Sequence, residues 1–185
     1  MVEAGGVGIL TLLDSTQLID FIKGHNRQTQ RIHRSEVQGG YTRPLAPLGA
    51  PTAVAMDVQH HRLFSAGRNP QMMVVLDSDT GKVLQSFPIT AGADATAYDS
   101  ESGLIFVSTR AGVVHVFHED SPNKFSGVET IKTEFGAKTM GLDTKTHTLF
   151  LDTADFGPAP APTADRPHPQ GAAIPGTFHV LVYGQ

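Results

Sequence analysis

The sequence predicts an all-β fold, and three observations lead to that prediction. Short segments of alternating apolar residues, such as 54–56, occur along the chain, and almost none shows a sustained helical period. Glycine and proline occur in every gap between these segments, as is typical of strands joined by turns. The third observation is an internal repeat.

One frame of residues occurs three times, with a Phe seven residues after an Asp. The three segments are Asp57–Phe64, Asp99–Phe106 and Asp143–Phe150. The aspartates recur after 42 and then 44 residues, which is the span of a four-stranded propeller blade. The repeat therefore predicts β-propeller blades, each made of four antiparallel strands.

Each position of the frame has a physical role. The Asp opens a hairpin turn, where its carboxylate can accept a hydrogen bond from the backbone N–H two residues on. Leu63 and Phe64 are neighbours and so point to opposite faces of a strand, as do the matching pairs in the other two units. Small residues suit a crowded innermost strand, and Ala55, Ala97 and Gly141 occupy matching places before the Asp. Both faces of each sheet are thus expected to be covered by neighbouring blades.

The second half of each unit also predicts strands. In the first complete unit these are 72–76 and 82–87, joined by a tight turn at 77–81. In the next unit they are 112–117 and 125–131, joined by a longer turn at 118–124.

We expect about 3.5–4 blades in one propeller domain, which is an incomplete ring for a single chain. A divergent partial blade is expected at 1–46, blades at 47–90 and 91–134, and a last blade at 135–185 with a Pro-rich insertion at 156–176. Two arrangements would complete the ring. One is head-to-tail assembly of two chains, and the other is a longer protein that supplies further N-terminal blades.

The composition narrows the possible functions. A net charge of −4 gives no general basic field for nucleic acid or an anionic membrane, so we predict no nucleic-acid partner. No apolar run reaches the roughly 18 residues that span a bilayer. The absence of cysteine excludes disulfides and thiolate chemistry, and it leaves the compartment open.

From about Pro44 onward the chain resembles the C-terminal half of bacterial YVTN-type, surface-layer-protein-like β-propeller repeat proteins. The resemblance is carried by the segments 51–57, 61–64, 73–82, 118–122 and 156–163. It implies a propeller fold and a family whose members are often exported and mostly without an assigned activity. The basic flank of a signal peptide is missing at the start of this chain, so localisation stays open.

The densest group of possible metal ligands is His118, Glu119 and Asp120, close to His115. Along a strand, residues three apart point to opposite faces, so His115 and His118 do not converge on one ion. We expect residues 118–120 to order a turn instead, and we predict no cofactor, with a divalent metal at this group as the alternative. The turn residues His60, His61 and His147 are expected to be solvated.

The Pro-rich insertion is the segment most suited to bind a partner. Proline favours an extended conformation that loses little entropy on binding. Alternatively, the insertion packs over the blade as a strap and shields an edge. The candidate partner-binding residues are Asp155, Phe156, Asp165, Arg166 and His168.

Catalytic motifs such as Gly-x-Ser-x-Gly and His-Glu-x-x-His are absent, so we predict no catalytic residue. The sequence thus favours a non-catalytic propeller scaffold that binds a small molecule or a protein at the channel mouth. The alternative is a propeller lyase or lactonase with a divalent metal on the channel axis. A third possibility is a purely structural surface-layer component.

Overall fold

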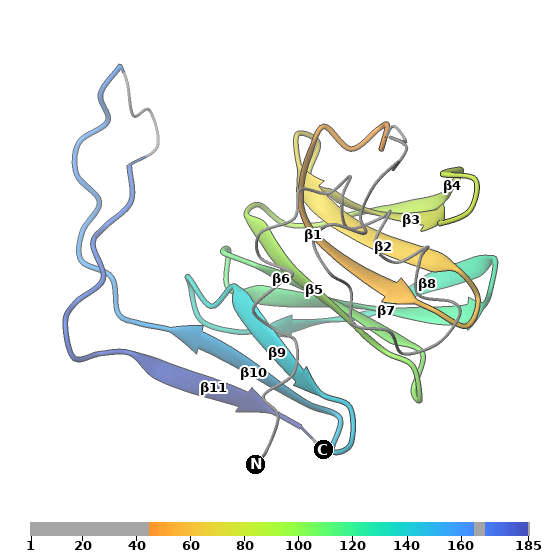
Figure 1. Cartoon of the computed structure of the whole chain (residues 1–185). Helices are drawn as coiled ribbons and strands as arrows, with labels where there is room; N and C mark the ends of the chain where they lie inside the picture. The colour runs from red at the N-terminus through yellow and green to blue at the C-terminus, as the bar shows by residue number, and fades with distance from the viewer. Residues whose placement is uncertain (1–44, 165–168, 185) are drawn as a thin grey trace, which may run out of the picture.

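The computed structural model describes residues 45–164 and 169–184, and within them the chain forms three antiparallel β-sheets (Figure 1). The partial blade expected at 1–46 lies almost wholly outside these residues. No helix in the described ranges is long and apolar enough to cross a bilayer.

The first sheet has four strands in the order β1-β2-β3-β4, so each strand pairs with the next one in sequence. Its strands are β1 (Ala50–Asp57), β2 (Arg62–Arg68), β3 (Met72–Asp77) and β4 (Val83–Pro88).

The second sheet repeats this arrangement in the order β5-β6-β7-β8. Its strands are β5 (Ala93–Asp99), β6 (Leu104–Thr109), β7 (Val113–Ser121) and β8 (Lys124–Lys132). One expectation is corrected here, because the long turn at 118–124 does not form. Ser121 pairs with Lys124, so β7 and β8 run on to a tight turn at Pro122 and Asn123.

The third sheet has three strands in the order β11-β10-β9. They are β9 (Thr139–Asp143), β10 (Thr148–Thr153) and β11 (His179–Tyr183). The innermost strands β1, β5 and β9 lie next to one another, which sets the three sheets side by side as propeller blades (Figure 1). Within the described residues the blades form part of a ring, so the prediction of an all-β, incomplete propeller is confirmed.

The core lies in the seams between the blades. Phe64 faces the seam between the first and second sheets, where it packs with Phe117 and Phe125. Leu63 belongs to a cluster on the other face of the first sheet. The predicted opposition of Leu63 and Phe64 is therefore confirmed.

The second seam is built in the same way. Phe106 of β6 packs against Leu149 and Leu151 of β10, while its neighbour Ile105 faces the first seam. Each described seam thus buries one face of a blade against the opposite face of the next.

Candidate functional site

Each repeated Asp orders the turn that follows the innermost strand. Asp57 accepts a hydrogen bond from the N–H of Gln59 at 2.9 Å. Asp99 accepts one from the N–H of Glu101 at 3.2 Å, and Asp143 accepts one from the residue two positions on at 2.9 Å. The predicted turn role of these carboxylates is confirmed.

The fourth residue after each Asp has a left-handed backbone conformation. It is His61 with φ 58°, Gly103 with φ 70° and His147 with φ 53°. A positive φ is uncommon for residues other than glycine, although histidine is among those that adopt it. This conformation turns the chain sharply before the second strand of each blade.

His147 connects the second blade to the third. Its Nδ1 lies 2.6 Å from Oδ2 of Asp99, whose side chain is almost fully buried. The hydrogen bond with Asp99 raises the pKa of His147. Burial raises the pKa of Asp99, but hydrogen bonds from Ser102, His147 and the N–H of Glu101 outweigh it, so the pKa lies below its ordinary value. The His147 side chain is exposed, as expected, and it also joins the second seam through Asp99.

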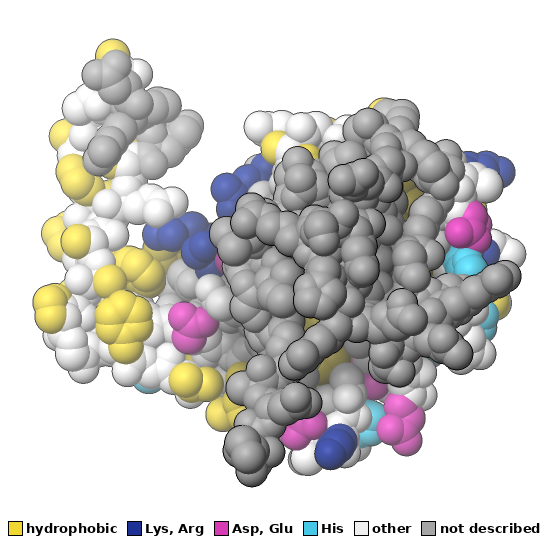
Figure 2. Space-filling view, in the orientation of Figure 1, with side chains coloured by type: hydrophobic (Ala, Val, Ile, Leu, Met, Phe, Trp, Pro, Cys, Tyr) yellow, Lys and Arg dark blue, Asp and Glu magenta, His cyan; other side chains and the backbone are white. Residues whose placement is uncertain are grey.

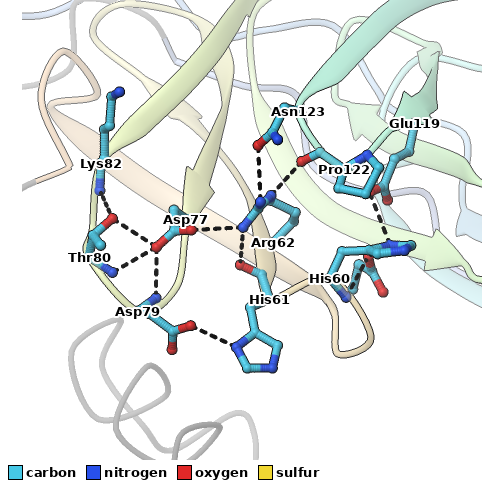
Figure 3. A network of polar contacts seen from close by, with 11 residues as sticks. His60, His61, Arg62, Asp77, Asp79, Thr80, Lys82, Glu119, Pro122 and Asn123 are labelled. Carbon is cyan, nitrogen blue, oxygen red and sulfur yellow. Dashed lines mark hydrogen bonds and ion pairs between the residues drawn. The ribbon is translucent and has the colours of Figure 1, made fainter.

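The first seam has a different polar cluster at the matching place. Gly103 has no side chain to reach Asp57, and His60 of the same turn contacts that carboxylate instead. Glu119, near the end of β7, also lies beside His60. His60 lies between the two acids, with its Nδ1 2.5 Å from Asp57 Oδ2 and 3.4 Å from Glu119 Oε1 (Figure 3). We call Asp57, His60 and Glu119 the seam cluster.

Tyr98 forms a hydrogen bond with the seam cluster. Its hydroxyl donates a hydrogen bond to Glu119 Oε2 at 2.9 Å. Burial, this hydrogen bond and the surrounding carboxylates raise the pKa of Tyr98. Burial also raises the pKa of Glu119, and the charge of Asp57 adds to that effect. The seam cluster therefore combines two buried carboxylates with a partly exposed histidine.

Arg62 lies beside the seam cluster and is held by other partners. Its guanidinium pairs with Asp77 at 2.8 Å and donates to Asn123 at 3.0 Å and to the carbonyl of Pro122 (Figure 3). Arg62 thus joins the first blade to the β7–β8 turn of the second.

The candidate metal ligands His118, Glu119 and Asp120 do not lie together in the structure. His118 and Asp120 bond to each other at 2.8 Å, and the hydroxyl of Ser126 donates to Asp120 at 2.9 Å. Glu119 points to the other face, because side chains alternate along β7. The three residues do not form one group, and Glu119 meets partners from 59 and 62 residues earlier in the chain.

The described parts of the insertion between β10 and β11, residues 154–164 and 169–178, form an arm that projects away from the blades (Figure 1). Phe156 bridges to Ala173 at its base and packs edge-on against Phe135, with ring centroids 5.8 Å apart. The guanidinium carbon of Arg110 lies 5.3 Å from the centroid of the Phe156 ring. Phe156 therefore anchors the arm to the second seam.

The remaining candidate residues of the arm are Asp155, Asp165, Arg166 and His168. Asp155 has an exposed side chain, and its backbone bonds to Ile174 and Thr177 across the base. Residues 158–164 are exposed, so this stretch is not packed over the blade as the strap alternative would require. Asp165, Arg166 and His168 lie outside the described residues.

Comparisons with known proteins support the fold of the chain. No family model and no curated protein sequence matches the chain. Yeast Sqt1 (Saccharomyces cerevisiae) is similar in structure, with a TM-score of 0.52 and 11% identity over 57% of this chain and 29% of that one. Hydrazine synthase of Kuenenia stuttgartiensis has a TM-score of 0.50 and 17% identity over 65% of this chain and 32% of that one.

A third similar structure is the β-propeller domain of Myceliophteria thermophila Cps50 (Swd1), with a TM-score of 0.48 and 10% identity over 71% of this chain and 42% of that one. The chain therefore spans less than half the length of the structures it resembles. The three sheets and their seams identify the chain as a set of β-propeller blades, and the likeness to the first two structures supports this fold.

Proposed function

We propose that the chain is a non-catalytic β-propeller scaffold that binds protein through the open face of its last sheet. The observation that carries this proposal is the exposure of apolar positions that the other two blades bury. In the first sheet, Phe64 pairs with Val75, and both are fully buried. In the second sheet, Phe106 pairs with Val116, and their exposures are 7% and 2%.

The same pair in the third sheet is Phe150 and Val182, and it is uncovered. Phe150 is 40% exposed and Val182 62% exposed, and the neighbouring Val180 is 59% exposed. Phe178, just before β11, is 72% exposed. Apolar side chains gather over the arm and the last sheet in the space-filling view (Figure 2). We call Phe150, Phe178, Val180 and Val182 the open face.

The repeat indicates what would cover the open face. In both described seams, the matching face is covered by the next unit of the same repeat, so a further unit of this repeat has the right shape and polarity. A second copy of the chain supplies such units, and we propose it as the occupant. Covering each of these side chains contributes about 1–2 kcal/mol, which together favours association.

Sedimentation velocity over a range of protein concentrations tests this function. We expect the wild type to form a concentration-dependent dimer, and the double variant Phe150→Asp/Val182→Asp to stay monomeric, because burying unpaired carboxylates is unfavourable. The control is Val58→Asp, in the β1–β2 turn, where Val58 is 61% exposed and outside the open face. It should dimerise like the wild type.

Two results would overturn the proposal. One is a folded wild type that is monomeric at every concentration, and the other is a double variant that dimerises as well as the wild type. Circular dichroism establishes that each variant keeps its β structure. Binding of a small molecule or another protein at the channel mouth stays a separate prediction, with added ligand and a thermal-shift readout as its test.

A further inference from the structure

We propose that the seam cluster of Asp57, His60 and Glu119 is a binding site for a divalent transition-metal ion such as Zn²⁺. Each of Asp57, His60 and Glu119 offers one ligand atom, and these atoms all lie within 4.8 Å of one another. The site lies between the β1–β2 turn of the first blade and β7 of the second. It is independent of the open face, which belongs to the third sheet.

One of the two ligand distances already suits a tetrahedral ion, and the other requires a side-chain movement. Ligands about 2.0–2.2 Å from such an ion lie about 3.3–3.6 Å from one another. His60 Nδ1 and Glu119 Oε1 are already 3.4 Å apart. His60 Nδ1 and Asp57 Oδ2, at 2.5 Å, must separate by about 1 Å to reach the tetrahedral spacing. The imidazole can make this movement because its side chain is 35% exposed.

An unpaired buried atom gives independent support for a ligand here. Glu119 Oε1 has no hydrogen-bond partner, although the Glu119 side chain is only 4% exposed. A buried carboxylate oxygen without a donor is unfavourable, and native structures satisfy nearly all such atoms. Oε1 points toward His60 Nδ1, and an ion between them would supply the missing partner.

Charge favours a cation at the same place. Two buried carboxylates, Asp57 and Glu119, belong to the cluster, and the guanidinium of Arg62 pairs with Asp77 outside it. Since buried negative charges repel each other in a medium of low polarity, a divalent ion between them relieves the repulsion.

Neighbouring groups hold the ligands in position. The Tyr98 hydroxyl binds the other oxygen of Glu119, and the N–H of Gln59 binds the other oxygen of Asp57. Such outer contacts orient the ligands of protein metal sites. One imidazole and two carboxylates suit Zn²⁺ or Mn²⁺ better than Ca²⁺, which takes six or more oxygen ligands. A bound ion would fasten the first blade to the second.

Isothermal titration of the tag-free chain with Zn²⁺ tests the site, with Ca²⁺ as the comparison ion. We expect the wild type to bind one Zn²⁺ ion per chain and to melt at a higher temperature with the ion than with EDTA. His60→Ala and Glu119→Gln should lose both effects, because each removes a ligand. His118→Ala is the matched control, since it removes a histidine that is bonded to Asp120 away from the cluster.

The positioning role of Tyr98 gives a second measurement. Tyr98→Phe keeps all three ligands and should weaken Zn²⁺ binding about tenfold to a hundredfold. The proposal is overturned if the wild type shows no saturable binding of Zn²⁺. It is also overturned if folded His60→Ala binds Zn²⁺ as tightly as the wild type, or if His118→Ala abolishes binding while His60→Ala keeps it.

Discussion

At the scale of single residues, the fourth position after the repeated Asp makes different contacts in the two seams. His147 crosses the second seam to Asp99, whereas the matching Gly103 leaves Asp57 to His60 and Glu119. Both positions have positive φ, so the backbone requirement is the same and only the side chain differs. The positive φ thus shapes the turn in each blade. The side chain at that position determines which contacts join the blade to the preceding blade.

The pair of His147 and Asp99 predicts a pH dependence of stability. The folded pKa of His147 lies above its ordinary 6.5, so its contribution is complete below that value and is lost as pH rises through the folded pKa. The folded pKa of Asp99 lies below its ordinary 3.8, so its contribution is present above 3.8 and is lost as pH falls through the folded pKa. The pair stabilises the protein most between about pH 4 and about pH 6.5.

Urea unfolding of the wild type and His147→Asn measures this effect, since Asn tolerates a positive φ. We expect the variant to be less stable near about pH 5.5, with a smaller difference near about pH 8. A difference in the free energy of unfolding that is equal at both pH values would contradict the role of the charged pair.

The sequence was sufficient for features that depend on local chemistry. The turn role of Asp57 and the opposed faces of Leu63 and Phe64 depend on neighbours in the chain, and the structure confirms both. The seam cluster could not be predicted in this way. Glu119 meets His60 because two blades dock, and spacing along one strand carries no information about that contact.

At the scale of elements, the described parts of the arm are joined to the blades at the base of the arm. Its base is held by Phe156 and by two backbone bonds, Gly157 N–H to Ala172 and Ile174 N–H to Asp155. Proline and alanine at 158–163 bury nothing within the described residues. The arm therefore contributes little to folding stability beyond its base.

Deletion of 158–171 tests this expectation while leaving the base residues in place. The melting temperature should stay close to that of the wild type, because surface changes that remove no packing have small effects. The matched control is Phe156→Ala, which removes the ring between Phe135 and Arg110 and should lower the melting temperature. A large loss of stability on deletion would show that the arm packs on the blades.

The position of the arm could be predicted from the sequence, but its direction could not. Proline and glycine marked an insertion between two strands, and β10 and β11 do flank it. Its direction depends on Phe156 packing against Phe135, and Phe135 lies in the connection after the second sheet. The sequence pattern of one repeat unit does not predict a contact with another unit, such as that between Phe156 and Phe135.

At the scale of the whole molecule, two seams join the described blades, the first blade to the second and the second to the third. The second sheet has a packed seam on each face, and the third sheet has one. In such arrays stability depends on the number of interfaces that each unit makes. The middle blade should therefore be the most resistant to local opening.

Hydrogen exchange followed by mass spectrometry measures this difference. Amides of β6 and β7 should exchange more slowly than those of β10 and β11, since local opening depends on buried contacts. Protection of β10 and β11 should rise with protein concentration when the open face is covered by a second copy. Equal protection of all three sheets at low concentration would contradict the gradient.

The open face also has a consequence for solubility. Among the described strands β11 is at the edge of the third sheet, and its alternating valines resemble the short apolar segments that nucleate unwanted sheet pairing. Pro175 and Gly176 stand shortly before it, and proline cannot extend a hydrogen-bonded ladder. The edge is thereby limited to five residues, which favours one specific covering partner over open-ended aggregation.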